Sequence, residues 1–151
     1  MYEQLREDIL HGIGRTLDYY VGRYVYGISE KELANVPSFR TFDRVMQIVS
    51  TLKTTLPLDE TWPFSLVENT RSAPKTRAYV AGFGVHAYEI ECGPHGGTVE
   101  DESFWWQTEA RSKCVAYGPD PETAILRACL LTAIKSLWIK QQAHQPAATT
   151  N

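Results

Sequence analysis

The chain has 151 residues, of which 43% are hydrophobic and 22% charged, and its formal net charge is −3. This length fits one domain with its own core, and the small negative charge argues against non-specific binding to DNA or RNA. The polar start is unlike a signal peptide, and no apolar run approaches the roughly 20 residues of a membrane span. We therefore expect a soluble cytoplasmic protein with reduced cysteines.

Two helices are predicted in the first third of the chain. The first spans residues 2–26, where apolar side chains recur every three or four positions, and Gly12 and Gly14 mark a bend or a close approach by another element. The residues from Ser29 favour a short helical turn that Pro37 ends. The second helix spans residues 41–55, with Thr41 as its N-cap.

Strand patterns follow from residue 62 to residue 117. Residues 62–67 predict a short first strand. Residues 76–81 and 85–92 predict a hairpin around Gly82-Phe83-Gly84, because glycines permit the positive φ angles of tight turns. A glycine-containing loop over residues 93–103 then leads to a last strand over residues 104–115.

The stretch from residue 116 to residue 134 predicts the start of a long helix over residues 121–142. The Asp120 carboxylate suits the N-cap, and Pro121 fits the first helical position. Residues 143–151 have the composition of a disordered tail. The expected fold class is α+β: residues 1–142 form a single domain with a mainly antiparallel four-stranded sheet packed by helices, in the order α-α-β-β-β-β-α.

The spacing of reactive side chains gives no catalytic or metal signature. No two histidines have zinc-site spacing, and Cys92-Gly-Pro-His95 is only half of such a site. The glycine loop lacks the Gly-Lys-Ser/Thr ending of a phosphate loop, and the acidic run at residues 100–102 is typical of a solvated surface. We therefore expect no catalytic residue, no metal and no cofactor.

Arginine and aromatic side chains of the predicted sheet suit a nucleotide-type ligand, since a guanidinium binds phosphate and rings stack on bases. We expect Arg77 and Tyr79 to share one strand face, and His86 and Tyr88 to share a face of the neighbouring strand. An exposed sheet face with solubilising charges is the alternative. Adjacent Trp residues face opposite sides of a strand, so one of them is expected in the core and the other at a surface. The candidate ligand-binding residues are Arg71, Arg77, Tyr79, His86, Tyr88, Trp105 and Trp106.

Two helical surfaces predict self-association. Tyr and Arg residues gather between positions 19 and 26, a composition enriched at protein interfaces, although helix packing on the sheet also explains it. The last helix is apolar nearly all round, which indicates burial on several sides and favours an oligomer contact. The candidate interface residues of a homo-oligomer are Tyr20, Arg23, Tyr24, Leu130, Leu137 and Trp138.

Several short motifs occur in order between residues 15 and 138. They are Leu17-Asp-Tyr-Tyr-Val21, Val25-Tyr-Gly27, Ser38-Phe-Arg-Thr-Phe-Asp43, residues 45–49, Trp62-Pro-Phe-Ser-Leu66, Ala116-Tyr-Gly-Pro-Asp-Pro121 and Ala124-Ile-Leu-Arg-Ala-Cys-Leu130. With them the chain resembles the phage ABA-sandwich domain family of bacteriophage accessory proteins. It departs from the family where Pro and Asp separate Gly118 from Pro121, and in the loop over residues 93–103. The resemblance implies a phage or prophage product acting in the host bacterial cytoplasm, and no catalytic residue.

These observations predict a phage counter-defence protein that binds and sequesters a nucleotide-derived immune signalling molecule without catalysis. The alternative is a protein inhibitor of a host defence complex, of the anti-CRISPR kind, although a net charge of −3 is small for mimicry of nucleic acid. A phage accessory protein with another role is a third possibility. An enzyme acting on such a messenger has no support in the sequence beyond scattered His and Glu residues.

Overall fold

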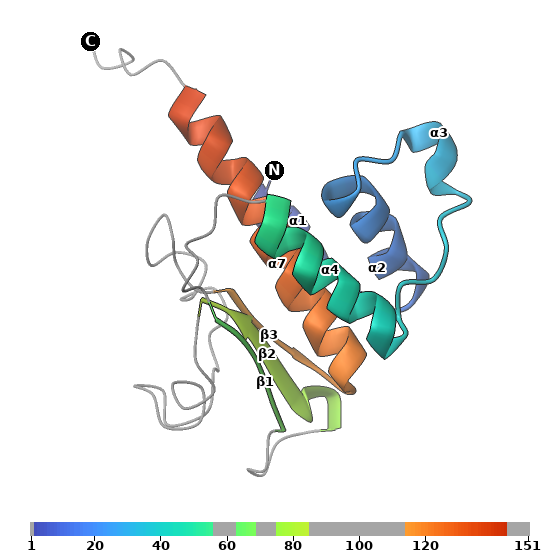
Figure 1. Ribbon diagram of the computed structural model, residues 1–151, viewed down its shortest axis with the longest axis vertical. Coiled ribbons are helices and arrows are strands. Elements are labelled where there is room, and N and C mark those ends of the chain that lie inside the picture. The colour runs from blue at the N-terminus through green and yellow to red at the C-terminus, as the bar shows by residue number, and fades with distance from the viewer. Residues whose placement is uncertain (1, 56–62, 69–74, 85–113, 145–151) are drawn as a thin grey trace.

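The computed structural model describes residues 2–55, 63–68, 75–84 and 114–144 (Figure 1). Within these residues the chain is α+β, as predicted from the sequence. The elements are α1 (Tyr2–His11), α2 (Arg15–Tyr20), the π-helical η1 (Val21–Val25), α3 (Glu30–Leu33), α4 (Phe42–Thr55), β1 (Phe64–Glu68), the 3-10 turn η2 (Lys75–Arg77), β2 (Tyr79–Phe83), β3 (Cys114–Gly118) and α7 (Pro121–His144).

The described strands form one antiparallel sheet in the order β1-β2-β3, so β2 is central. Ala81 of β2 pairs with Leu66 on one side and Ala116 on the other. The predicted turn at Gly82-Phe83 is wrong, because both residues belong to β2 and only Gly84, with φ 77°, follows the strand. Distant segments occupy both edges of β2, and local glycine spacing carries no information about them. The predicted partner strand over residues 85–92 lies outside the described residues.

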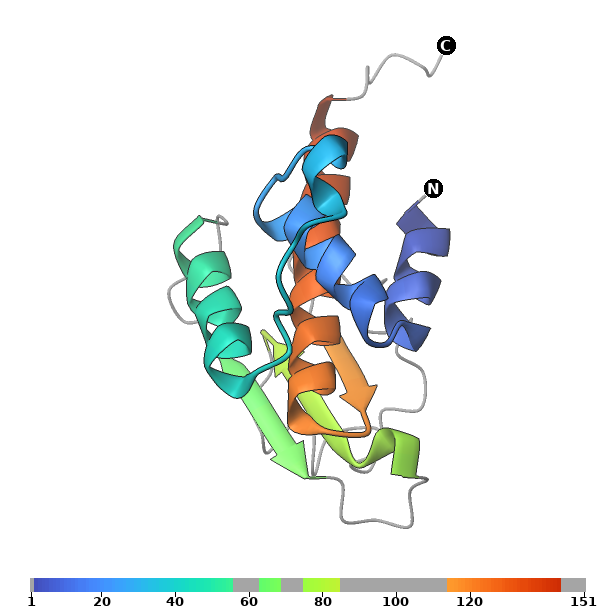
Figure 2. The ribbon, with the colours of Figure 1, turned by 90° about the vertical axis from the view of Figure 1, so that its right-hand side faces the viewer.

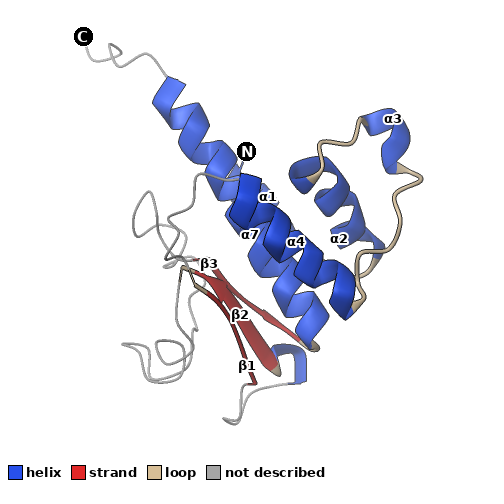
Figure 3. Cartoon of the chain, viewed as in Figure 1, coloured by secondary structure: helices blue, strands red, loops and turns tan. Residues whose placement is uncertain are grey.

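Helix α7 lies between the sheet and the other helices. It packs on β2 and β3 with one side and contacts α1, α4 and η1 with the others. Figure 2 shows α1, α2 and α4 around α7 on the side away from the sheet, and Figure 3 shows the sheet as a separate layer. Every residue from Ala124 to Lys135 is buried. Packing within one chain therefore accounts for the helix that is apolar all round, and it corrects the predicted oligomer contact at Leu130, which is 0% exposed.

The start of α7 is built as the sequence predicts. The Thr123 amide donates to Asp120 Oδ1 at 2.7 Å, and the Ala124 amide donates to the Asp120 carbonyl at 3.2 Å. Asp120 is thus confirmed as the N-cap. A glycine is required at position 118, because a Cβ there would lie 2.9 Å from the Ala124 Cα. The connection over residues 118–120 consequently packs closely against the first turn of α7.

Arg127 ties α7 to two other parts of the fold. Its Nε and Nη2 donate to the Gly12 carbonyl at 3.1 and 2.9 Å, and its Nη1 donates to the Tyr117 carbonyl at 2.8 Å. The side chain is buried, with the residue only 7% exposed. Arg127 is therefore a structural residue that joins α7, the end of β3 and the break between α1 and α2.

The predicted first helix is broken at its glycines. Helix α1 ends at His11 and α2 begins at Arg15, with Gly14 at φ 58°, which confirms the predicted bend. The break also turns Ile13 outward, so that it is 67% exposed instead of lying on the apolar face. After α2 the Tyr26 amide donates to the Val21 carbonyl at 3.2 Å, the five-residue spacing of a π-helix.

Candidate functional site

The structure separates two of the predicted ligand-binding residues. Arg77 lies in η2, and its guanidinium carbon is 5.0 Å from the centroid of the Tyr117 ring. Tyr117 clusters with Val80 on the sheet face that points away from α7, whereas Tyr79 packs against the main core on the α7 side. The prediction that Arg77 and Tyr79 share a face is wrong, because η2 interrupts the alternation of a strand. Outside the described residues lie Arg71, His86, Tyr88, Trp105 and Trp106.

The predicted interface residues at the end of the first helix do lie together, on α2 and η1. Apart from the half-buried Val25, the exposed or half-buried side chains there are polar or aromatic, while Leu17, Asp18, Val21 and Gly22 form the buried side. Of the remaining interface candidates Leu137 is half-buried on α7, and the side chain of Trp138 lies outside the described residues. We name the α2–η1 surface by its members Arg15, Thr16, Tyr19, Tyr20, Arg23 and Tyr24.

Two arginines of the α2–η1 surface lie against tyrosine rings. The guanidinium carbon of Arg15 is 5.8 Å from the Tyr19 centroid, and that of Arg23 is 5.4 Å from the Tyr24 centroid. At an exposed site such a cation–π contact contributes about 0.5–1 kcal/mol. The contacts restrict both long side chains before any partner arrives, which lowers the entropy cost of binding.

The π-helical turn shapes this surface. It places more residues in a turn than an α-helix does and so rotates the side chains after it relative to those of α2. Gly22 inside the turn leaves room for the side chains of Leu33 and Val36, since a Cβ at Gly22 would lie 2.8 Å from Val36 Cγ1 and 3.2 Å from Leu33 Cδ2. Such irregular turns occur frequently at functional sites, and no sequence pattern predicts this one.

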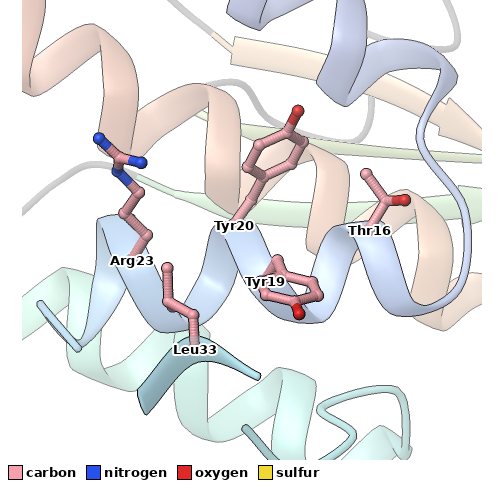
Figure 4. Close-up of a pocket in the computed structure, with 5 residues that line it drawn as sticks. All are labelled: Thr16, Tyr19, Tyr20, Arg23 and Leu33. Carbon is pink, nitrogen blue, oxygen red and sulfur yellow. The ribbon is translucent and has the colours of Figure 1, made fainter. Parts of the chain in front are cut away.

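A pocket of about 320 Å³ lies on the α2–η1 surface and is lined by Thr16, Tyr19, Tyr20, Arg23 and Leu33. Figure 4 shows the side chains of Thr16, Tyr20 and Arg23 projecting in a row from one side of the helix, with Leu33 of α3 below them. The four-residue spacing of Thr16 and Tyr20 places these two side chains on the same face of α2. The pocket thus combines hydroxyl groups and a guanidinium with an apolar wall.

Thr16 and Tyr20 line both this pocket and a neighbouring acidic groove between α1 and α2. The groove measures about 520 Å³, and its lining includes Glu7, Asp8 and His11. Burial raises the pKa of the Tyr20 phenol, and the negative charge of Asp8 raises it further. The phenol consequently stays protonated and is able to donate a hydrogen bond at neutral pH.

A buried carboxylate anchors α2 beneath this surface. Asp18 is 0% exposed, and its Oδ1 accepts a hydrogen bond from the Phe39 amide at 2.9 Å. Its Oδ2 lies 3.3 Å from Arg40 Nε and 3.8 Å from Arg15 Nη1. Two arginines against one carboxylate leave a net positive charge at this end. No sequence motif reveals the role of Asp18, although an acidic residue beside Leu17 on the apolar face is a signal of a buried carboxylate.

Tyr26 does not belong to the α2–η1 surface, although it is close in sequence. Its ring stacks on Phe39, with centroids 5.6 Å apart. Together with the exposed Phe42 it lines a separate groove of about 530 Å³ along α4. Phe42 is therefore a useful reference for an exposed aromatic side chain outside the candidate site.

The described cysteines are placed as core residues. Burial raises the pKa of the Cys114 thiol, and the nearby Lys135 charge and Thr132 hydroxyl act in the opposite direction. Burial alone raises the pKa of Cys129. Both thiols stay protonated and are poor nucleophiles at neutral pH. Across the part of the chain that the structure describes, no group of three or more His, Cys, Asp and Glu side chains is placed to hold a metal ion.

Comparisons with known proteins find no relative from which a function could be inferred. No family model matches the chain, and neither a curated protein nor a solved structure matches it. The resemblance to the phage ABA-sandwich domain family accordingly stays a prediction. Among the described helices, none has both the length and the apolar character that crossing a membrane requires.

Proposed function

We propose that this chain is a non-catalytic binding protein that docks its α2–η1 surface onto a protein partner. The observation that carries the proposal is the arrangement of Arg15 on Tyr19 and Arg23 on Tyr24 along one partly exposed helical surface. Tyr and Arg dominate the binding energy of protein interfaces, where they act as rigid contact groups. A π-helical turn within the same surface adds to this support.

The shape of the α2–η1 surface favours a macromolecule over a small ligand. Small ligands bind in concave sites that cover most of their surface. Here the side chains are distributed along the helix, and Tyr19 is 37% exposed. The described sheet residues Arg77 and Tyr79 point to opposite faces and do not converge on one ligand. A protein surface can contact all the members of such a row at once.

The biological role that we propose combines this binding surface with the resemblance to phage proteins. The chain would be a phage-encoded inhibitor of a host defence complex, acting in the host bacterial cytoplasm. A homo-oligomer through Tyr20, Arg23 and Tyr24 is a competing occupant of the same surface. The broad apolar surface of α7 does not support self-association, because the apolar side chains from Ala124 to Ile134 are buried within one chain.

A second candidate function is sequestration of a nucleotide-derived immune signalling molecule without catalysis. The observation that favours it is that Arg23, Tyr20 and Tyr19 line one pocket (Figure 4). A guanidinium suits a phosphate and the rings suit a base. The pocket volume of about 320 Å³ is at the low end for ligand sites, so we rank this function second.

A matched pair of double variants tests the proposed function. Y19S/R23S removes an aromatic ring and an arginine from the α2–η1 surface, and F42S/R44S removes the same types from α4. We expect the tagged wild type and F42S/R44S to capture one stoichiometric protein from bacterial lysate, and Y19S/R23S to lose it. Equal capture by both variants would contradict the proposal.

Two further readouts separate the competing occupants. A thermal shift of the wild type with cyclic dinucleotides or ADP-ribose derivatives, without a captured protein, would favour sequestration instead. Light scattering that finds a dimer for the wild type and a monomer for Y19S/R23S would assign the surface to a second copy. The proposal expects a monomer and no nucleotide-dependent shift.

A further inference from the structure

Arg23 is held between a ring and a carboxylate in the free chain. Its guanidinium lies on Tyr24, and its Nη1 lies 3.2 Å from Glu30 Oε1 of α3. The two charged side chains are 50% and 79% exposed. Within the described residues Arg23 is the one polar contact of the Glu30 carboxylate. The ring therefore keeps Arg23 in place, while Glu30 is attached through a single exposed pair.

An exposed ion pair of this kind is easily exchanged. It contributes little to stability, because water and salt screen both charges. A guanidinium offers five donors in a planar fork and binds an incoming carboxylate through two of them. Replacing Glu30 by another carboxylate therefore costs the fold little and leaves Arg23 on its ring.

We propose that a carboxylate side chain of the protein partner enters the pocket beside Arg23 and displaces Glu30, an inference that rests on the proposed function. Thr16 and Tyr20 present their hydroxyl groups along the same row as Arg23 (Figure 4). These hydroxyls donate to the oxygens of the incoming carboxylate. Leu33 supplies the apolar wall that packs against its methylene groups.

The charges around the pocket orient such an acidic partner. Glu7 and Asp8 of the neighbouring groove repel a carboxylate on the far side of Tyr20. At the other end, Arg15 and Arg40 share the single carboxylate of Asp18 and attract negative charge. Complementary charges of this kind fix the register of an interface. The partner surface is thus expected to carry acidic residues that face Arg15 and Arg23.

Nuclear magnetic resonance on the full ¹⁵N-labelled chain tests this inference. The probe is a hexaglutamate peptide, with AMP in a parallel titration, and the Nε–H resonances of Arg23 and Arg44 are followed. We expect a saturable shift of Arg23 with hexaglutamate and none of Arg44. Glu30→Gln should tighten this binding about threefold, since it removes the internal competitor. Arg23→Gln should abolish the binding, which is followed at the backbone amides of Tyr20 and Tyr24 because this variant lacks the Arg23 Nε–H.

Three results would overturn the inference. They are a lack of saturable shift at Arg23, an unchanged midpoint in Glu30→Gln, and tighter binding of AMP than of hexaglutamate. The thermal midpoint of Glu30→Gln should equal that of the wild type, which controls for folding. If Y19S/R23S still loses its protein partner while Glu30→Gln changes nothing, only this inference fails. Equal capture by Y19S/R23S and F42S/R44S would instead remove the proposed function.

Discussion

Arg127 on α7 and Arg23 on η1 are the same residue type in opposite roles. Arg127 is 7% exposed and donates to two backbone carbonyls, those of Gly12 and Tyr117. The side chain of Arg23 is 50% exposed and contacts the Tyr24 ring and the exposed carboxylate of Glu30. An arginine that satisfies buried carbonyls holds the fold together, whereas one that lies on a ring at the surface is available to a partner.

The comparison extends to the helices that carry these residues. From Ala124 to Lys135, helix α7 is buried between the sheet and the other helices (Figures 1 and 2), so its side chains there determine stability. The α2–η1 segment buries one side only, through Leu17 and Val21. Substitutions should accordingly separate into two classes, those that lower the free energy of unfolding and those that change binding alone.

The largest effect is expected for Arg127→Met. This change leaves the buried carbonyls of Gly12 and Tyr117 without their charged donor, and losing such a network costs about 3–5 kcal/mol. Chemical denaturation measures the loss, with Arg23→Met as the matched control, which should cost less than about 1 kcal/mol. Equal costs for the two variants would break the comparison between α7 and the α2–η1 surface.

Gly118→Ala should follow in size. The added Cβ would collide with the backbone nitrogen and the Cα of Ala124, so the start of α7 must move, at a cost of about 1–3 kcal/mol. Gly27→Asn is the control, because Gly27 has φ 65° but nothing within 4 Å of its Cβ position, and Asn tolerates this conformation. Denaturant midpoints compare the two variants, and a cost of Gly118→Ala no larger than that of Gly27→Asn would contradict the packing at this turn.

Alkaline pH should weaken the α7 core. The folded-state pKa of Cys129 is raised by burial above its ordinary value of 9.0, so the unfolded thiol ionises first as the pH rises. The stabilisation is therefore complete below pH 9 and is lost above it, by about 1.4 kcal/mol per pH unit. Urea titrations should show a shallower loss for Cys129→Ala than for the wild type. Identical slopes would mean that this thiol does not resist ionisation.

The smallest effect on stability is expected on the α2–η1 surface. Tyr19→Ser removes one exposed ring and its contact with Arg15, at a cost of about 0.5–1 kcal/mol. Denaturation with the same protocol checks this value. A cost of several kcal/mol would instead make Tyr19 a structural residue and would weaken its assignment to a binding surface.

Local sequence signals predicted much of the fold but less of the candidate site. The Asp120 cap, the break at Gly14 and the helix after Thr41 depend on neighbouring residues, and the structure confirms them. The role of Arg127 depends on Gly12, far away in the chain. A charged side chain in a helix looks the same in sequence whether it meets water or a carbonyl.

The sheet illustrates the same limit. The glycine pattern around Gly82 predicted a turn, but pairing of β2 with β1 and β3 extends the strand through Phe83. The α2–η1 residues were found from their composition, because Tyr and Arg gather in one short segment. The π-helical turn that arranges them was not predicted, and it contains Gly22, which packs closely against the more distant Val36.

Site-specific photo-crosslinking tests the central claim, that the α2–η1 surface is the binding face. Benzoylphenylalanine is placed at Tyr19 in one chain and at Phe42 in another, since both side chains are exposed. After irradiation in bacterial lysate, we predict a single protein adduct from position 19 that Arg23→Gln removes, and no adduct from position 42. An adduct from position 42 alone, or one at position 19 that is unaffected by Arg23→Gln, would contradict the account.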